Sequence, residues 1–214
     1  MRLTFCNAVL KWNHQYQLRV WWSDESTFKV EDLLKHQPKK YRSKENLYLK
    51  KNKIQRKKSI NVWVALRGDG KLLFEVLDEK YNSEQYIQLL YNKLSLMESK
   101  TSFLMQDGAG IHTSDDAIDW INFLWGNRWI GLKSERLQFP PYSMDLTPLD
   151  FAFWPHVKRL VAQQYPETTS KLLDSIIYTL STFDGDTIIR MCQGVAERCS
   201  KCLRMDGDRF EGEL

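Results

Sequence analysis

The sequence predicts an α/β domain, in which a mixed sheet is flanked by helices and followed by a C-terminal helical extension. Strand patterns and helical patterns alternate along most of the chain, in the order strand, strand, strand, helix, strand, helix, strand, helix. Residues 166–214 show mainly helical periodicity. The chain has 214 residues, of which 43% are apolar, and is therefore long enough to bury a substantial core.

The first predicted strand begins near Leu18, where polar and apolar residues alternate. One face carries Leu18, Val20, Trp22, Asp24, Ser26, Phe28 and Val30. This period of two indicates a long strand or a tight hairpin. Asp24 shares the apolar face, where a carboxylate is costly unless a cation or hydrogen-bond donors meet it. The alternative is that Asp24 lies in a turn and points to solvent.

The next elements are a hairpin, a helix and a central strand. Apolar runs at 60–66 and 71–77 are joined by Arg67-Gly68-Asp69-Gly70, which is typical of a hairpin turn. A helix is expected from Ser83, with buried positions three or four residues apart. Residues 101–106 form a short apolar run that ends at Asp107. Because α/β sheets expose functional side chains at strand ends, Asp107 is a candidate site residue.

The second half of the chain is predicted to be largely helical. A helix opened by Thr113 or Ser114 should end at Gly126, before a short strand at 128–132. Thr147-Pro148-Leu149-Asp150 has the composition of a helix N-terminus, and this helix should continue to about residue 164. Two amphipathic helices are expected near 169–182 and 185–203. Taken alone, Asp150 fits a capping residue as well as a functional one.

The charge is concentrated in one segment of the chain. Residues 35–58 hold eleven Lys or Arg and one acidic residue, although the net charge of the whole chain is only +4. This basic segment suits contact with a polyanion, while the alternatives are a solvated loop or a nuclear-localisation signal. No apolar stretch approaches the roughly 20 residues that span a bilayer, so no membrane partner is expected.

The four cysteines indicate a protein with reduced thiols. They are Cys6, Cys192, Cys199 and Cys202. This usage fits an intracellular protein better than a disulfide framework. Cys199 and Cys202 form a C-x-x-C pair, but no second pair stands at zinc-finger spacing, so a zinc site is disfavoured.

Three motifs give the chain a family resemblance. SDESTF carries Asp24, QDGAGIHT carries Asp107, and PPYSMDLTPLDFAFW carries Asp145 and Asp150. With the predicted element order, an acid in the first strand, an acid after the fourth and an acid opening a late helix resemble the ribonuclease-H-like fold. The ordered motifs resemble the catalytic domain of the mariner-superfamily transposases, over roughly residues 1–205. Gly110 and Met144 replace prolines that are usual in that family.

The resemblance implies a catalytic role for Asp24, Asp107 and Asp150, and a structural role for Asp145. The implied function is cleavage of DNA strands at transposon ends, followed by joining of the freed 3′-hydroxyl to target DNA. Two Mg²⁺ or Mn²⁺ ions would serve this chemistry, and hard oxygen ligands suit both metals. Asp24 would bridge the ions, and Asp107 and Asp150 would each hold one. His112 is interpreted as a local structural residue and Trp154 as a core anchor.

The implied partners are double-stranded DNA and a second copy of the chain. The candidate DNA contacts in the basic segment are Lys39, Lys40, Arg42, Lys57 and Lys58. The expected location is the nucleus. The expected organisation is a linker-helix remnant at 1–17, a catalytic domain at 18–165 with the basic insertion 35–58, and a helical extension at 166–214.

Two alternatives to the transposase interpretation stay open. A domesticated, non-enzymatic protein could keep the fold and the basic segment for binding DNA or a partner. The family's usual helix-turn-helix module does not precede the first strand in this sequence, which is consistent with a catalytic core or such a remnant. An unrelated metal nuclease of the same fold, such as a ribonuclease or resolvase, is the second alternative, although the motif set disfavours it.

Overall fold

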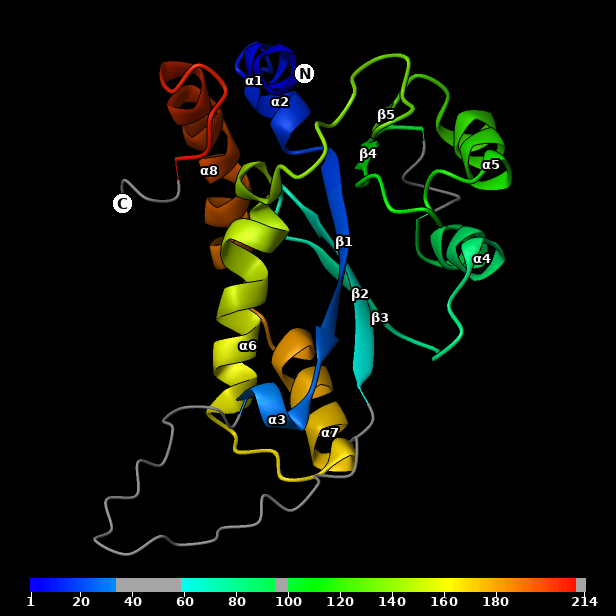
Figure 1. The fold of residues 1–214 in the computed structure, drawn as a ribbon, viewed down its shortest axis with the longest axis vertical. Coiled ribbons are helices and arrows are strands. Elements are labelled where there is room, and N and C mark those ends of the chain that lie inside the picture. The colour runs from blue at the N-terminus through cyan, green and yellow to red at the C-terminus, as the bar shows by residue number, and fades with distance from the viewer. Residues whose placement is uncertain (34–58, 95–99, 211–214) are drawn as a thin grey trace, which may run out of the picture.

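The computed structural model describes residues 1–33, 59–94 and 100–210. In the described residues, five strands form one sheet, and helices cover both of its faces (Figure 1). The elements in chain order are α1 (Arg2–Val9), α2 (His14–Gln17), β1 (Val20–Phe28), α3 (Val30–Leu33), β2 (Ile60–Arg67), β3 (Leu72–Leu77), α4 (Ser83–Leu94), β4 (Phe103–Met105), α5 (Asp115–Trp125), β5 (Trp129–Ile130), a 3₁₀ turn (Met144–Leu146), a π-helical turn (Leu149–Phe153), α6 (Trp154–Ala162), α7 (Thr169–Ser181) and α8 (Gly185–Arg204).

The sheet has the strand order β3-β2-β1-β4-β5. β1 pairs with β2 and β2 with β3 in antiparallel fashion, whereas β4 runs parallel to both β1 and β5. The expected mixed sheet is therefore confirmed. The hairpin between β2 and β3 closes with Gly70, whose φ of 91° favours glycine.

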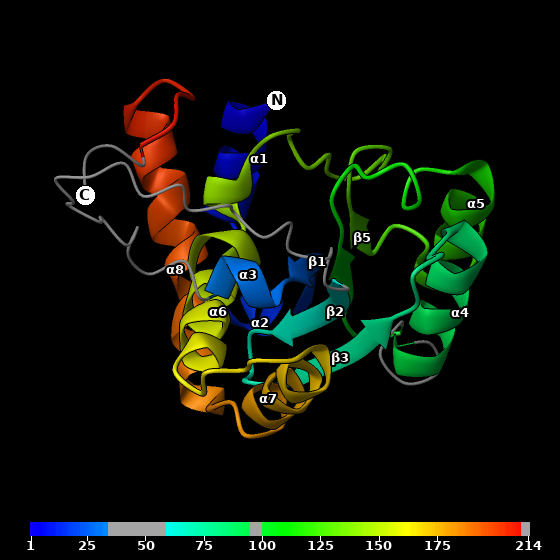
Figure 2. The ribbon, with the colours of Figure 1, turned by 60° about the horizontal axis from the view of Figure 1, so that its bottom comes forward.

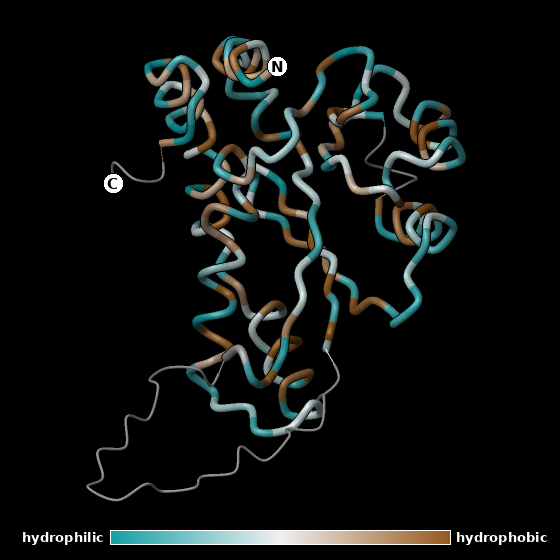
Figure 3. The backbone as a smooth tube through the Cα atoms, viewed as in Figure 1, coloured by the Kyte–Doolittle hydropathy of each residue, from teal (hydrophilic) through white to brown (hydrophobic). Residues whose placement is uncertain are grey.

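Two hydrophobic cores lie on opposite faces of the sheet. The first packs α1, α6, α7 and α8 against one face, and it includes Trp22 and Phe28 of β1. The second packs α4 and α5 against the other face, and it includes Trp21. Figure 2 shows this division from a second direction, and Figure 3 shows hydrophobic stretches along the strands and on the flanking helices. The alternation predicted for β1 therefore separates its side chains between two cores.

The helices begin and end where local signals predict. The Ser114 side chain accepts a hydrogen bond from the Ala117 amide at the start of α5, and Gly126, with φ 52°, ends that helix. Thr168 and Asp184 cap α7 and α8 in the same way. Each cap satisfies an amide that the helix itself leaves without a partner. No helix within the described residues is long and apolar enough to cross a membrane.

The N-terminal and C-terminal helices pack on one another and on the same core. α1 contacts α8, and the two helices bury Cys6, Cys199 and Cys202. A hydrogen bond to Cys199 raises the pKa of the Cys6 thiol above its ordinary value, and burial raises that of Cys202 to about 11. Residues of α7 and α8 pack in the same core as those of the sheet. The domain boundary expected at residue 166 stays a prediction.

Candidate active site

Asp24 lies in the middle of β1, on the face that α6 covers. It pairs with Val64 of β2 in the antiparallel register. The indole nitrogen of Trp154, at the start of α6, donates a 2.7 Å hydrogen bond to Oδ2 of Asp24. The strand interpretation is therefore confirmed, and the alternative of a solvent-facing turn is wrong. Trp154 does anchor its helix in the core, with 4% of its surface exposed, and it also orients this carboxylate.

Asp107 follows β4 at the same level of the sheet as Asp24. The parallel register pairs Trp22 with Met105, and each aspartate lies two residues beyond its member of that pair. Successive odd or even positions of a strand point to the same face, so this register directs the two carboxylates to one side. The Ala109 amide donates to Oδ1 of Asp107 at 3.0 Å, which folds the backbone sharply after the strand.

His112 holds Asp107 from the end of this loop. Its Nδ1 lies 2.6 Å from Oδ1 of Asp107, and its Nε2 lies 3.1 Å from Oε1 of Glu25. The Gln106 side chain supports the loop, because its amide donates to the His112 carbonyl and its oxygen accepts from the Tyr86 hydroxyl. The interpretation of His112 as a local structural residue agrees with these contacts. The Glu25 contact was not predicted from the sequence.

Asp150 lies in the π-helical turn that precedes α6. The Thr147 hydroxyl accepts a 3.0 Å hydrogen bond from the Asp150 amide, as expected for a helix N-cap. The same hydroxyl donates to Oδ2 of Asp150 at 3.4 Å. Leu149 and Phe153 are buried on either side. A π-turn adds one residue to the helical repeat and is frequent at functional sites.

Asp145 forms an ion pair with an N-terminal residue. Arg2 of α1 contacts both of its oxygens, with Nη1 to Oδ1 at 2.7 Å and Nη2 to Oδ2 at 2.5 Å. Arg2 also donates to Ser143 Oγ at 2.8 Å and to the Gly207 carbonyl at 2.7 Å. The Asp145 side chain is 1% exposed. This bidentate ion pair fits the structural role that the resemblance implies for Asp145.

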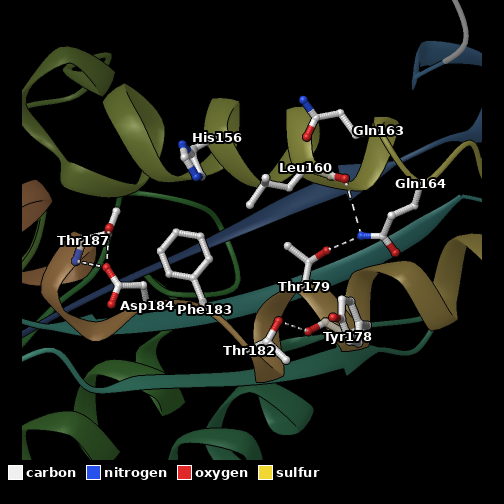
Figure 4. Close-up of a pocket in the computed structure, with 10 residues that line it drawn as sticks. All are labelled: His156, Leu160, Gln163, Gln164, Tyr178, Thr179, Thr182, Phe183, Asp184 and Thr187. Atoms are coloured by element: carbon white, nitrogen blue, oxygen red, sulfur yellow. Dashed lines mark hydrogen bonds between the residues drawn. The ribbon is translucent and has the colours of Figure 1, made fainter.

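The three aspartates line one cavity of about 580 Å³. Asp24, Asp107 and Asp150 come from three separate elements, and the lining contains no lysine, arginine or histidine among the described residues. A second cavity, of about 400 Å³, lies between α6 and α7 and reaches the start of α8 (Figure 4). It is lined mainly by amide, hydroxyl and aromatic side chains and includes His156 and Asp184. The cavity of about 580 Å³ is therefore the one that concentrates carboxylates.

The electrostatics of the acidic cavity are unfavourable for three negative charges. Burial, then the charges of Asp150 and Glu25, raise the pKa of Asp24 well above its ordinary value. Burial and the charge of Asp107 likewise raise the pKa of Asp150. Burial opposes ionisation of Asp107 too, but the hydrogen bond and charge of His112 lower its pKa overall. Burial alone would lower the pKa of His112. The charges and hydrogen bonds of Glu25 and Asp107 outweigh burial and raise this pKa to about 10.

The donor set fits a hard divalent cation, although the side chains are not gathered into a coordination sphere. Within residues 1–33, 59–94 and 100–210, no group of three His, Cys, Asp or Glu side chains stands close enough to hold a metal ion. Asp24 and Asp150 have raised pKa values in a cavity whose described lining holds no cationic side chain, and a bound cation would relieve this repulsion.

The sequence signals for the site were uneven. The position of Trp154 beside the site could have been recognised from the sequence. It follows Asp150 by four residues and therefore lies on the same helix face as Asp150. Arg2 carried no signal, because its partner Asp145 is 143 residues away. The candidate DNA contacts Lys39, Lys40, Arg42, Lys57 and Lys58 lie outside the described residues.

The strand order, the helices on both faces and the acidic cavity define a domain of the ribonuclease-H-like class. A family model for the DDE superfamily endonucleases matches residues 19–173. That match covers most of the chain, and the chain belongs to this family. No curated protein sequence matches it.

The fold is also similar to that of solved mariner transposase structures. The crystal structure of the Mos1 mariner transposase catalytic domain superposes with a TM-score of 0.70 at 19% identity, covering 98% of this chain and 94% of that one. The Mos1 transposase catalytic domain with raltegravir and Mn gives 0.68 at 19% identity, with the same coverages of 98% and 94%. The pre-cleavage Mos1 transpososome gives 0.72 at 20% identity, and this chain spans 63% of the transposase chain there. The expected ribonuclease-H-like fold is thereby confirmed.

Proposed function

We propose that the chain is a metal-dependent DNA transposase catalytic domain. It cleaves DNA strands at transposon ends and joins the 3′-hydroxyl to target DNA, with Asp24, Asp107 and Asp150 as the catalytic carboxylates. The observation that carries this proposal is the convergence of these three side chains on one cavity without a cationic lining residue. Membership in the DDE superfamily endonucleases supports the cleavage of nucleic acid.

Each carboxylate has a supporting partner on one of its oxygens. Trp154 donates to Oδ2 of Asp24, His112 contacts Oδ1 of Asp107, and Thr147 contacts Oδ2 of Asp150. These contacts orient the carboxylates while leaving oxygen atoms for a cation, as hydrogen bonds to the ligands of a metal ion commonly do. Two Mg²⁺ or Mn²⁺ ions held there would activate water, stabilise the leaving oxygen and neutralise phosphate charge.

The solved relatives are consistent with this cofactor and substrate. Mos1 structures have been determined with Mn and with Mg, and Mos1 also forms paired-end and strand-transfer complexes. By analogy, we expect this chain to bind divalent metal and double-stranded DNA, and to act as a homodimer on that DNA. Light scattering of the protein with and without a duplex would measure the oligomeric state.

A plasmid-nicking assay tests the proposed activity. The purified chain should convert supercoiled plasmid to the nicked form in millimolar Mn²⁺ or Mg²⁺ but not in EDTA. Asp24→Asn, Asp107→Asn and Asp150→Asn should each slow nicking at least about 100-fold, because each removes a charge that stabilises the transition state. Asp116→Asn, an exposed acid in the first turn of α5, is the matched control and should retain the rate.

The same preparations separate the enzyme from the non-enzymatic alternative. Wild-type protein that binds plasmid DNA but nicks it with neither metal would favour a domesticated binding protein. Nicking that survives in all three aspartate variants would refute the assigned carboxylates. Strand joining is tested with a duplex that already carries a free 3′-hydroxyl, since transfer of its label into plasmid does not depend on the first cleavage.

The basic segment 35–58 supplies the proposed DNA contacts Lys39, Lys40, Arg42, Lys57 and Lys58. Replacing these five by Gln should weaken duplex binding and flatten its dependence on salt, because fewer counterions are released. We also propose a nuclear location, which a fluorescent fusion in eukaryotic cells would test. The segment is the expected localisation signal, so the five-Gln variant should lose nuclear enrichment if that expectation holds.

A further inference from the structure

The two edges of the sheet are protected to different degrees. The edge strand β5 has only two residues, and the loop that follows it bonds back to Gly131 through the Leu137 carbonyl and the Phe139 amide. The other edge strand, β3, has six residues. In the described part of the chain, β3 pairs only with β2, and no loop makes a backbone hydrogen bond to Leu72–Leu77. An edge of this kind can pair with a further strand.

The hydrogen bonds of the β2–β3 hairpin determine which backbone groups of β3 face outward. The Arg67 amide donates to the Lys71 carbonyl at 2.9 Å, so these two residues form a hydrogen-bonded pair. Hydrogen-bonded and non-hydrogen-bonded pairs alternate along an antiparallel ladder. In the observed register, the residues of β3 that bond to β2 are therefore Leu73, Glu75 and Leu77. The residues whose amides and carbonyls point to the open edge are Leu72, Phe74 and Val76.

The side chains along this edge are mainly apolar. A cavity of about 420 Å³ beside β3 is lined by residues 72–76, by Lys93 of α4 and by Ile177 of α7, which is 40% exposed. Figure 2 shows β3 between these two helices. The strand contains neither lysine nor proline, with which proteins commonly protect an edge. Its one charged residue is Glu75, whose Oε2 lies 2.6 Å from Nζ of Lys93. The edge therefore presents an apolar strip whose one charge is compensated.

The order of side chains makes this edge complementary to itself. A second copy of β3 related by a two-fold axis runs antiparallel, and its outward-facing residues meet those of the first copy. Two registers keep nearly all of β3 paired. One places Glu75 opposite Glu75 of the second copy, where like charges repel. The other places Phe74 opposite Phe74, and Leu72 opposite Val76 on each side of the axis. This second register pairs aromatic with aromatic and aliphatic with aliphatic side chains, and it opposes no like charges.

We propose that β3 is a self-association surface, at which a second copy of the chain adds its own β3 in the antiparallel register centred on Phe74. The two sheets then form one continuous sheet, joined by hydrogen bonds between the outward amides and carbonyls of the two strands. The interface is isologous, because each copy contributes the same residues. It needs neither metal nor DNA. It is therefore separate from the homodimer on DNA proposed above, and it stands whether or not the chain cleaves DNA.

Sedimentation velocity of the wild-type protein in EDTA, without DNA, tests the association. Between about 1 and 300 µM, the weight-average mass should rise from 25.4 kDa toward twice that value, as expected for a small interface of micromolar affinity. Phe74→Lys should raise the dissociation constant at least about 10-fold, because it places two cations opposite each other at the axis. Phe123→Lys is the matched control. Phe123 is 84% exposed on α5 and does not line this cavity, so its replacement should leave the association unchanged.

Cysteine cross-linking tests the register and does not depend on the stability of the lysine variant. In the proposed register, the two copies of residue 74 form a hydrogen-bonded pair with Cα atoms about 5.5 Å apart, within disulfide range. The two copies of residue 76 are displaced by four residues, or about 13 Å along the strands, beyond that range. With oxidised glutathione, Phe74→Cys should form a disulfide-linked dimer and Val76→Cys should not. An equimolar mixture of Leu72→Cys and Val76→Cys should cross-link, because these positions face each other. The wild-type protein should not, because its cysteines are buried.

Three results would overturn this interface. They are a mass that stays at 25.4 kDa with no cross-link in Phe74→Cys, an association that Phe74→Lys and Phe123→Lys weaken equally, and equal cross-linking of Phe74→Cys and Val76→Cys. After the first result, alkylation of Phe74→Cys by iodoacetamide would show what replaces the second copy. A slowly reacting thiol would mean that another segment of the same chain covers the edge, and a freely reacting thiol would mean that the edge stays open.

Discussion

Asp145 and Asp150 lie five residues apart in the same segment, but their surroundings differ in every respect. Asp145 is buried against Arg2, which neutralises both of its oxygens. Asp150 lines a cavity with two other aspartates, and burial together with the charge of Asp107 raises its pKa. One carboxylate therefore stabilises the fold, whereas the other belongs to a cluster of carboxylates in which burial and like charge oppose ionisation.

The largest expected effect that separates the two regions is a loss of stability at high pH. His112, the cation beside the cluster, has a folded-state pKa of about 10 against an ordinary value of 6.5. Its stabilisation is fully present below pH 6.5 and is lost as pH rises through about 10, at about 1.4 kcal/mol for each pKa unit. Urea unfolding in EDTA between pH 6 and 10 should therefore show a fall of several kcal/mol.

His112→Asn is the control for this pH dependence. The variant should be less stable at pH 6, because Asp107 and Glu25 lose their cationic partner, and its stability should change less up to pH 10. An equal pH slope in both proteins would assign the effect to other groups.

Breaking the ion pair should cost about 3 kcal/mol, the lower end for removing one partner of a buried pair. Asp145→Asn leaves the Arg2 guanidinium, 17% exposed, without its carboxylate. Urea unfolding at pH 7 measures the loss. Glu197→Gln, which breaks the more exposed pair with Lys201, should cost no more than about 0.5 kcal/mol. Equal losses in the two variants would show that burial does not distinguish the pairs.

Metal binding should stabilise the cluster and leave the ion pair unaffected. Mn²⁺ at about 100 times its dissociation constant should add about 2.7 kcal/mol to the free energy of unfolding. A thermal melt should show the corresponding rise, at roughly 2–4 °C per kcal/mol for a chain of this size. Asp116→Asn should respond to Mn²⁺ as wild type does, and Asp24→Asn should not. A response retained in Asp24→Asn would place the metal elsewhere.

The smallest effect is a gain in stability when one negative charge is removed from the cluster. Asp24→Asn keeps an oxygen that can accept from Trp154 while removing a buried charge that faces Asp150 and Glu25. The raised pKa of Asp24 means that ionising it in the folded state costs free energy at neutral pH. The metal-free variant should therefore melt about 2–4 °C higher, equivalent to about 1 kcal/mol. A midpoint below that of the wild-type protein would mean that the Asp24 carboxylate is already neutralised in the folded wild type.

The helices were the most predictable part of the fold. Residues 169–182 and 185–203 were expected as helices, and the structure has them at Thr169–Ser181 and Gly185–Arg204. Amphipathic periodicity and capping residues act within a few positions of one another, so a sequence records them directly. The π-turn at Leu149–Phe153 leaves no such record, because its extra residue depends on packing against the sheet.

The candidate site was predictable where it follows strand and helix ends. Asp107 was located by the end of an apolar run, whereas pattern alone left Asp150 between a cap and a functional residue. The structure shows both: Thr147 caps the Asp150 amide, and the Asp150 side chain lines the cavity. Contacts between distant segments, such as Glu25 with His112, depend on the folded register and could not be predicted.

The Arg2 contacts also determine how far the chain can be shortened. Arg2 bonds to Asp145, Ser143 and the Gly207 carbonyl, and Arg209 bonds to the Tyr142 carbonyl. Residues 2, 207 and 209 all lie outside the region 19–173 that the family model matches. A protein trimmed to that shared region would keep all three aspartates but lose the contacts that fix the segment leading to Asp150. The region that the family model matches therefore lacks the contacts that fix the segment leading to Asp150, and we expect deletions of residues 2 or 207–209 to disturb the cavity.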